Sequence, residues 1–269
     1  MEDLIIITCL IIFIIFLKLE YPKIDYKCFI LTTNDDSNGR LDTFLDFHDS
    51  RIPIEVVRGD ATKTPKQADK HKYLVEPKYY KNALKLYYDN NSLRPNITYF
   101  NLGAIGCYMG HLDIYRRAFL QNVKYALVFE DNVVITNKKF YKEVQTFIDK
   151  HGDDFELCFF HCLSRFKDTD SNVDESEKVK WISSTKCYLI HVDNMRKYYE
   201  HFLPMDNHID MKHEDLIAKG ARVYYKDLRT CLMINRGTSS IIGHSDWYNK
   251  DFFSKQYPNE KTSVLKSGY

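Results

Sequence analysis

The sequence predicts an α/β fold in which a mostly parallel central sheet carries helices on both faces. Short apolar runs alternate along the chain with segments whose apolar residues recur at helical spacing. Strands that are connected through helices run parallel, and both faces of such a sheet are covered. Because ligands of these folds bind beyond the carboxyl ends of the strands, we expect functional side chains there.

Each predicted strand is an apolar run that ends at polar or turn-forming residues. The first strand stops at a stretch rich in Asn, Asp and Gly (34–39), the second at Arg58-Gly59-Asp60 and the third at Glu130-Asp131-Asn132. The predicted strands cover 27–33, 52–57, 124–129, 155–161, 181–192 (as one or two strands) and 221–225.

Helices are predicted where apolar residues recur three or four positions apart. The Lys-rich stretch 61–72 is expected to be a mobile excursion, and the acidic stretch 168–177 a loop. The predicted helices cover 40–48, 79–88, 103–119, 138–150, 193–202 and 210–219.

The helix predicted over 103–119 is interrupted by glycines near its start. Gly106 and Gly110 lie four positions apart, so a second backbone can approach that side of the helix closely. An exposed glycine inside a helix costs about 1 kcal/mol relative to alanine. Two of them indicate a packing or ligand requirement, although a helix terminus explains them almost as well. One apolar face consists of Ile105, Met109, Leu112, Tyr115 and Phe119.

The composition excludes one class of function and favours another. A formal net charge of +1 and a pI of about 7.6 give no field that would attract nucleic acid, so no such partner is expected. The 20 tyrosines suit sugar binding, because their rings stack on sugars and their hydroxyls bond to them, but half-buried tyrosines are the simpler explanation. The seven cysteines have neither zinc-site nor disulfide-framework spacing, so buried free thiols are expected.

An almost uninterrupted apolar run, 4–17, opens the chain. It is short for a bilayer span of about 20 residues, but no cleavage site follows it. We therefore predict a membrane anchor or signal segment over 1–26, one domain over 27–250 and a polar tail over 251–269. The flanking charges favour a cytosolic body, whereas the glycosylation sequons at 90–92 and 96–98 favour the secretory lumen, which we prefer slightly.

The acidic cluster Glu130-Asp131-Asn132 is the sharpest chemical feature of the sequence. An apolar strand brings two carboxylates to the carboxyl edge of the sheet, and hard divalent cations prefer carboxylate oxygens. Enzymes that act on nucleotide sugars need such a cation beside the diphosphate leaving group. A Glu-Asp pair after a strand is also common in ordinary turns.

The segment from Gly103 to Asn132 resembles glycosyltransferase family 25, which includes lipopolysaccharide-modifying transferases and procollagen galactosyltransferases. The family pattern is a helix start of the form Gly-Glu-x-Gly-Cys-x-x-Ser-His, followed by a strand that ends in Glu-Asp-Asp. This chain has GAIGCYMGH from Gly103 to His111 and VFEDN from Val128 to Asn132. Weaker similarity extends over most of 27–242.

Three positions depart from that pattern: Asn132 replaces Asp, Ala104 replaces Glu and Gly110 replaces Ser. An asparagine offers a cation an amide oxygen without a charge, so metal affinity would fall or the ligand set would shift. The alternative hypothesis is therefore a catalytically inactive sugar- or nucleotide-binding membrane protein on the same fold. A phosphotransferase ranks last, because no glycine-rich phosphate loop is present.

The resemblance implies a GT-A type, Rossmann-like fold, a UDP-hexose donor (galactose or glucose), Mn²⁺ and an inverting transfer to a glycan or a hydroxylysine-type protein. It also suggests three groups of site residues. The general base is Asp210 or Glu214, although a helix N-cap or a solvated charge explains these as well. The metal ligands are Asp131, Glu130, Asn132 and His244, of which His244 is otherwise part of a polar tail. The nucleotide-sugar contacts are Thr32, Thr33, Arg40, Asp60, Gly103, Gly106 and His111, of which His111 is otherwise a core histidine.

Overall fold

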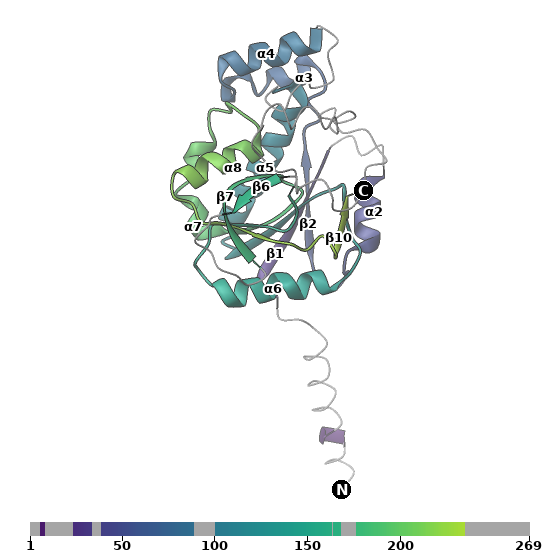
Figure 1. Cartoon of the computed structure of the whole chain (residues 1–269). Helices are drawn as coiled ribbons and strands as arrows, with labels where there is room; N and C mark the ends of the chain where they lie inside the picture. The colour runs from purple at the N-terminus through teal and green to yellow at the C-terminus, as the bar shows by residue number, and fades with distance from the viewer. Residues whose placement is uncertain are drawn as a thin grey trace.

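The computed structural model describes residues 6–8, 24–33, 39–88, 100–162, 164–167 and 176–234. It confirms the predicted α/β class (Figure 1). The helices are α2 (Arg40–Phe47), α3 (Pro65–Asp69), α4 (Pro77–Tyr88), α5 (Leu102–Leu120), α6 (Lys139–His151), α7 (Val192–Arg196) and α8 (Ile209–Ala218), with 3-10 turns η1 (Lys72–Leu74) and η2 (Tyr199–Phe202).

The main sheet has eight strands in the order β2-β1-β3-β8-β5-β9-β7-β6. They are β1 (Tyr26–Thr33), β2 (Ile54–Gly59), β3 (Tyr125–Glu130), β5 (Leu157–Phe159), β6 (Ser164–Lys167), β7 (Ser176–Ser183), β8 (Cys187–His191) and β9 (Val223–Lys226). The sheet is mixed, because β8 and β7 run opposite to the other strands. A separate antiparallel pair joins β4 (Val133–Ile135) to β10 (Leu232–Ile234).

Helices cover both faces of the sheet, as predicted. Along β1, Phe29 and Leu31 point into one apolar core, and Cys28 and Ile30 point into the other. The first core is built with α4, α5, α7 and α8, and the second with α2 and α6. Successive side chains of a strand point to opposite faces, so a strand that is apolar throughout must be covered twice.

The glycines of α5 allow the close backbone approach that their spacing predicts. A Cβ atom on Gly106 would lie 2.2 Å from the carbonyl oxygen of Asp60 and 2.6 Å from Oγ1 of Thr62. A Cβ atom on Gly110 would lie 2.5 Å from Cδ1 of Leu31. The two glycines therefore let α5 lie directly against the ends of β1 and β2.

The prediction of a mobile excursion at 61–72 is wrong, because this stretch holds α3 and the first residue of η1. Thr64 and Gln67 form a capping box at the start of α3, and Pro65 occupies its first turn. The helix predicted over 193–202 is divided into α7 and η2. Figure 1 shows α3 and α4 at one end of the molecule and α6 at the other.

Among the described residues, no cysteine forms a disulfide. Within the described ranges, no helix has both the length and the apolar character needed to cross a bilayer. Most of the predicted anchor and both sequons lie outside the described residues.

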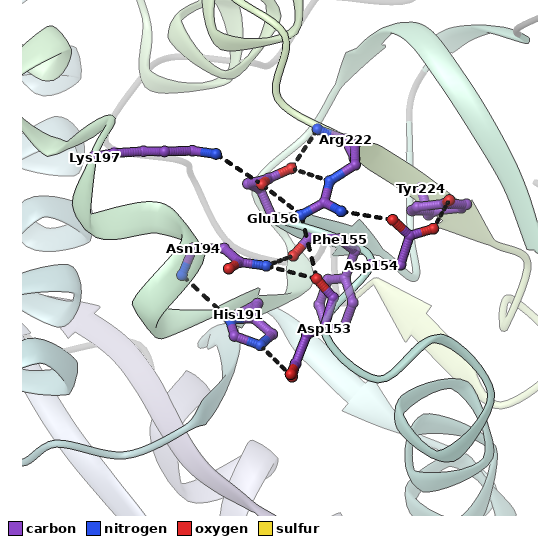
Figure 2. A network of polar contacts seen from close by, with 9 residues as sticks. All are labelled: Asp153, Asp154, Phe155, Glu156, His191, Asn194, Lys197, Arg222 and Tyr224. Carbon is purple, nitrogen blue, oxygen red and sulfur yellow. Dashed lines mark hydrogen bonds and ion pairs between the residues drawn. The ribbon is translucent and has the colours of Figure 1, made fainter.

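A network of charged side chains ties together the edge of the sheet where β3 begins (Figure 2). The buried carboxylate of Glu156 accepts from Arg222 through Nε at 3.1 Å and through Nη2 at 2.9 Å, and Lys197 lies 3.4 Å away. His191, in the same network, pairs in register with Tyr125, the first residue of β3. The network therefore lies at the edge of the sheet opposite Glu130, where it stabilises the packing of the strand ends.

Candidate functional site

The carboxyl ends of three parallel strands meet at one edge of the sheet. In register, Leu31 of β1 lies between Val57 of β2 and Glu130 of β3. The amide of Asp131 donates to the carbonyl of Leu31 at 3.0 Å, so the pairing continues one residue beyond β3. Thr32, Asp60 and Asp131 therefore leave the sheet at the same edge.

Asp131 contacts two of the residues predicted to bind the nucleotide. The hydroxyl of Thr32 donates to its Oδ2 at 2.8 Å, and Nε of Arg40 lies 3.3 Å from its Oδ1. Arg40 opens α2, the first helix after β1. Burial raises the pKa of Asp131 above its usual value, against the opposing effects of Arg40 and Thr32. Thr32 lies on β1, Arg40 on α2 and Asp131 directly after β3, and the three side chains form one polar cluster.

Glu130 is held by different partners. Thr185 donates to its Oε1 at 2.6 Å, and the ammonium of Lys186 contacts its Oε2. Nε2 of the buried His111 lies 3.7 Å from Oε1. Burial alone would raise the pKa of Glu130, but Lys186, with His111 behind it, holds that pKa well below its usual range. Glu130 is therefore a carboxylate with both oxygens engaged by protein donors.

Lys186 is a site residue that the sequence did not reveal. Burial alone would lower its pKa, yet the pairing with Glu130 raises it above the usual value. Its main chain pairs with the same residue, because the amide of Glu130 donates to the carbonyl of Lys186 at 2.9 Å. This contact depends on β8 lying antiparallel beside β3, an order that no local sequence pattern encodes.

Asn132 presents a buried oxygen that suits a cation or a ligand N–H group. Its Oδ1 is buried and has no hydrogen-bond partner among the described residues. A buried acceptor without a partner costs free energy, so an external donor or cation at this oxygen would be favourable. Together with the carboxylate of Asp131, this oxygen fits a divalent metal with oxygen ligands.

A second group of possible metal ligands includes Glu130. Atoms of Cys107, His111 and Glu130 lie within 4.8 Å of one another. Thiolate and imidazole are softer ligands than the oxygen set that Mn²⁺ prefers. The ammonium of Lys186 already neutralises Glu130 in this group. The oxygen atoms of Asp131 and Asn132 therefore fit Mn²⁺ better.

A buried string of polar side chains leads from Glu130 to α8. Nδ1 of His111 lies 2.8 Å from the hydroxyl of Tyr188, which contacts the hydroxyl of Tyr115. That hydroxyl lies 2.9 Å from Nε2 of His213. All four side chains are fully buried, and burial lowers the pKa of His213 to about 3. His213 is therefore a neutral donor or acceptor inside the core.

The remaining residues predicted to contact the nucleotide lie at the ends of β1 and β2 and in the first turns of α5. Asp60 pairs with Lys70 at 2.8 Å and with His71 at 2.9 Å, and these contacts hold its pKa below the usual value. Gly103 lies buried in the first turn of α5, and the amide of Gly106 donates to Thr62. Thr33 ends β1 and is partly buried.

The two candidates for the general base lie on α8, against another part of the sheet. Asp210 is not the N-cap, since His208 occupies that position, and its Oδ1 accepts from the amide of Met211 at 3.0 Å. Glu214 accepts from Nε1 of Trp181 on β7 at 2.5 Å. Burial raises the pKa of Glu214, against the opposing effect of Trp181. The predicted ligand His244 lies outside the described residues.

Comparison with known families gives a match over most of the chain. The model described as "Glycosyltransferase family 25 (LPS biosynthesis protein)" matches residues 28–212. The matched region includes α5, with its glycines, and the acidic cluster at the end of β3. Comparison with curated proteins gives no match.

Solved structures overlap with this chain only loosely. The structure "A197 from STIV" has a TM-score of 0.38 and 9% identity, and the overlap covers 75% of this chain and 81% of that chain. A UDP-glucose pyrophosphorylase complexed with UDP-glucose has a TM-score of 0.41 and 9% identity, with 75% and 90% covered. Mouse xyloside xylosyltransferase 1 has a TM-score of 0.35 and 9% identity, with 65% and 71% covered. Overlaps of this size establish no shared activity.

Proposed function

Since this chain belongs to glycosyltransferase family 25, we propose that it moves galactose or glucose from a UDP-sugar to an acceptor hydroxyl, with inversion at the anomeric carbon. The observation that carries the proposal is the cluster of Thr32, Arg40 and Asp131 at the carboxyl edge of the sheet. Ligands of parallel α/β sheets bind at this edge. The acceptor is a glycan or a hydroxylysine-type protein.

Asp131 and Asn132 would hold Mn²⁺. The support is the carboxylate of Asp131, fixed by Thr32, and the buried Oδ1 of Asn132, which lacks a partner among the described residues. When bound, the cation would neutralise the charge that develops on the diphosphate as the sugar leaves. His244 is a further proposed ligand from the C-terminal segment. Glu130, whose two carboxylate oxygens contact Thr185 and Lys186, would order these side chains beside the cation.

The nucleotide would lie across the ends of β1 and β2. Arg40 is close enough to Asp131 to exchange that contact for one with a phosphate oxygen. Thr33 ends β1 and Asp60 follows β2, and Gly106 lets the start of α5 pack directly against the backbone of Asp60. Gly103, in the first turn of α5, is a further proposed contact. His111 supports this surface from the core side through Glu130.

The transfer is a single displacement. The acceptor oxygen forms a bond to the anomeric carbon while the bond from that carbon to the phosphate oxygen breaks, and its electron pair leaves with UDP. The proton of the acceptor hydroxyl passes to Asp210 or Glu214. Burial raises the pKa of Glu214, which strengthens that carboxylate as a base. The pocket contributes mainly by aligning the two reactants.

The N-terminal segment 1–26 is proposed as a membrane anchor, and the secretory lumen as the location of the domain. The support is the apolar run 4–17 and the two sequons. Treatment of the cell-expressed protein with an endoglycosidase tests this proposal. A mass decrease is expected, and an unchanged mass in a chain whose sequons are accessible would contradict the luminal location.

UDP release by the full chain tests the transfer itself. UDP-galactose and UDP-glucose are offered separately, each with Mn²⁺ and with a chelator. Release that requires Mn²⁺ is expected for one donor. If UDP binds but neither sugar is turned over with any glycan or hydroxylysine peptide offered, the inactive sugar-nucleotide-binding alternative is favoured instead.

A further inference from the structure

The Lys186 side chain lies at the end of β3, at the same edge of the sheet as Asp131. We propose that Lys186 binds the diphosphate of the sugar nucleotide, with Glu130 as the anchor that holds its ammonium in place. This inference rests on the proposed function and adds a residue to its site.

The contacts of Glu130 favour the role of an anchor. One carboxylate oxygen accepts from Thr185 at 2.6 Å and the other contacts the ammonium of Lys186. The main chains of Glu130 and Lys186 are also hydrogen-bonded, at 2.9 Å. Two independent contacts between the same two residues fix where the ammonium lies.

The ammonium retains donors for a ligand. It has three N–H groups, and within the described residues Glu130 supplies the oxygen that it contacts. The Lys186 side chain is 19% exposed, and that of Glu130 is 15% exposed, so the pair is partly buried but still reaches solvent at this edge of the sheet. A phosphate oxygen fits the remaining donors, because it carries charge and accepts several hydrogen bonds.

The charges of the side chains at the site also favour a diphosphate as the ligand of Lys186. Glu130 and Asp131 carry two negative charges, and Lys186 and Arg40 carry two positive ones, so the local sum is zero. Without Lys186 these side chains would sum to −1, and the site would attract a diphosphate less strongly. Two roles are therefore conceivable for this lysine: it only neutralises Glu130, or its ammonium contacts the phosphates.

A double variant in which glutamine replaces both Glu130 and Lys186 distinguishes neutralisation of Glu130 from phosphate binding. The affinity of the full chain for UDP is measured by calorimetry with Mn²⁺ and with a chelator, for the wild type, for Lys186→Gln and for the double variant Glu130→Gln/Lys186→Gln. We expect UDP to bind roughly tenfold more weakly to both variants, as for loss of a charged hydrogen bond. Lys186→Arg should retain most of the affinity, and binding of uridine, which has no phosphate, should not change.

The matched control is a second lysine–glutamate pair. Lys226 lies 2.9 Å from Glu143, and the double variant Glu143→Gln/Lys226→Gln makes the same chemical change away from the acidic cluster. It should bind UDP as the wild type does. Thermal unfolding checks each fold. If Lys186→Gln does not fold because Glu130 is left unpaired, the double variant Glu130→Gln/Lys186→Gln and Lys186→Arg still test the proposal.

Two results would overturn the inference alone: wild-type UDP affinity in the double variant Glu130→Gln/Lys186→Gln, or equal weakening of UDP and uridine. The first would mean that Lys186 only neutralises Glu130. A wild-type chain that binds no UDP would instead overturn the UDP donor of the proposed function, together with the inference.

Discussion

The hydroxyl of Thr32 donates to the carboxylate of Asp131 at 2.8 Å, and this contact links the ends of two neighbouring parallel strands. Both side chains are at least nine-tenths buried. The hydrogen bond fixes the orientation of the carboxylate that we propose as the main metal ligand, before any ligand arrives.

Replacing Thr32 by valine should weaken binding of Mn²⁺ and UDP. The change removes one hydrogen bond to a charged group, which contributes about 1.5–3 kcal/mol, so a loss of roughly tenfold or more is expected. Calorimetric titration of UDP in the presence of Mn²⁺ measures it. Thr32→Ser keeps the hydroxyl and should bind nearly as the wild type does. Equal binding by the valine variant would show that this contact does not orient the site.

Replacing Gly106 by alanine should destabilise the protein. The new Cβ atom would lie 2.2 Å from the backbone oxygen of Asp60, so α5 would have to move away from the end of β2. We expect the free energy of unfolding to fall by about 1–3 kcal/mol. Urea unfolding measures the change. The matched control is Gly59→Ala, where the nearest atom would be 3.4 Å away, at ordinary contact distance. Equal unfolding midpoints for the two variants would contradict the close approach.

The sequence was sufficient for the elements that depend on local pattern. The first strand, the glycine helix and the strand ending at Glu130 were predicted close to their observed bounds, because each is a strong apolar run or a periodic face. The Thr64–Gln67 capping box was also readable, but the lysines around it suggested a polar excursion.

What the sequence could not provide is the order of the strands. Thr32, Arg40 and Asp131 were proposed for separate reasons, and only the parallel pairing of β1 with β3 brings them together. Lys186 carries no local signal at all. It becomes visible only because β8 runs antiparallel between β3 and β5, a long-range pairing that determines the neighbours of Glu130.

The Glu156–Arg222 pair should stabilise the fold in a pH-dependent way. Burial alone would raise the pKa of Glu156, but Arg222 lowers it below its usual value of 4.5. The contribution to the free energy of unfolding is therefore fully present above about pH 4.5, and is lost as the pH falls through the lower folded-state pKa. Glu156→Gln should cost about 3 kcal/mol near pH 7 and less in acid.

Urea titrations of Glu156→Gln at several pH values measure this difference. Asp149→Asn, which removes an exposed carboxylate on α6, is the control and should change stability little. A cost for Glu156→Gln that stays constant down to pH 2 would contradict the assignment.

His213 should make the fold less stable in acid. Burial lowers its folded-state pKa to about 3, whereas the unfolded value is 6.5. Between these values the unfolded state binds more protons, so stability falls as pH falls, by up to ~1.4 kcal/mol per pH unit. His213→Gln should remove this slope. Proton NMR of the histidine ring checks it directly, and a His213 that titrates near pH 6 would contradict the buried neutral state.

Turnover by Asp131→Asn tests the proposed transferase most directly. The substitution keeps the shape of the side chain and removes the charge at the end of β3. UDP release from UDP-galactose and UDP-glucose is measured with Mn²⁺ for the wild type, for Asp131→Asn and for Asp149→Asn. We predict metal-dependent release by the wild type and by Asp149→Asn, and a loss of at least about 100-fold in Asp131→Asn. Undiminished release by Asp131→Asn would contradict the assignment of this edge as the active site.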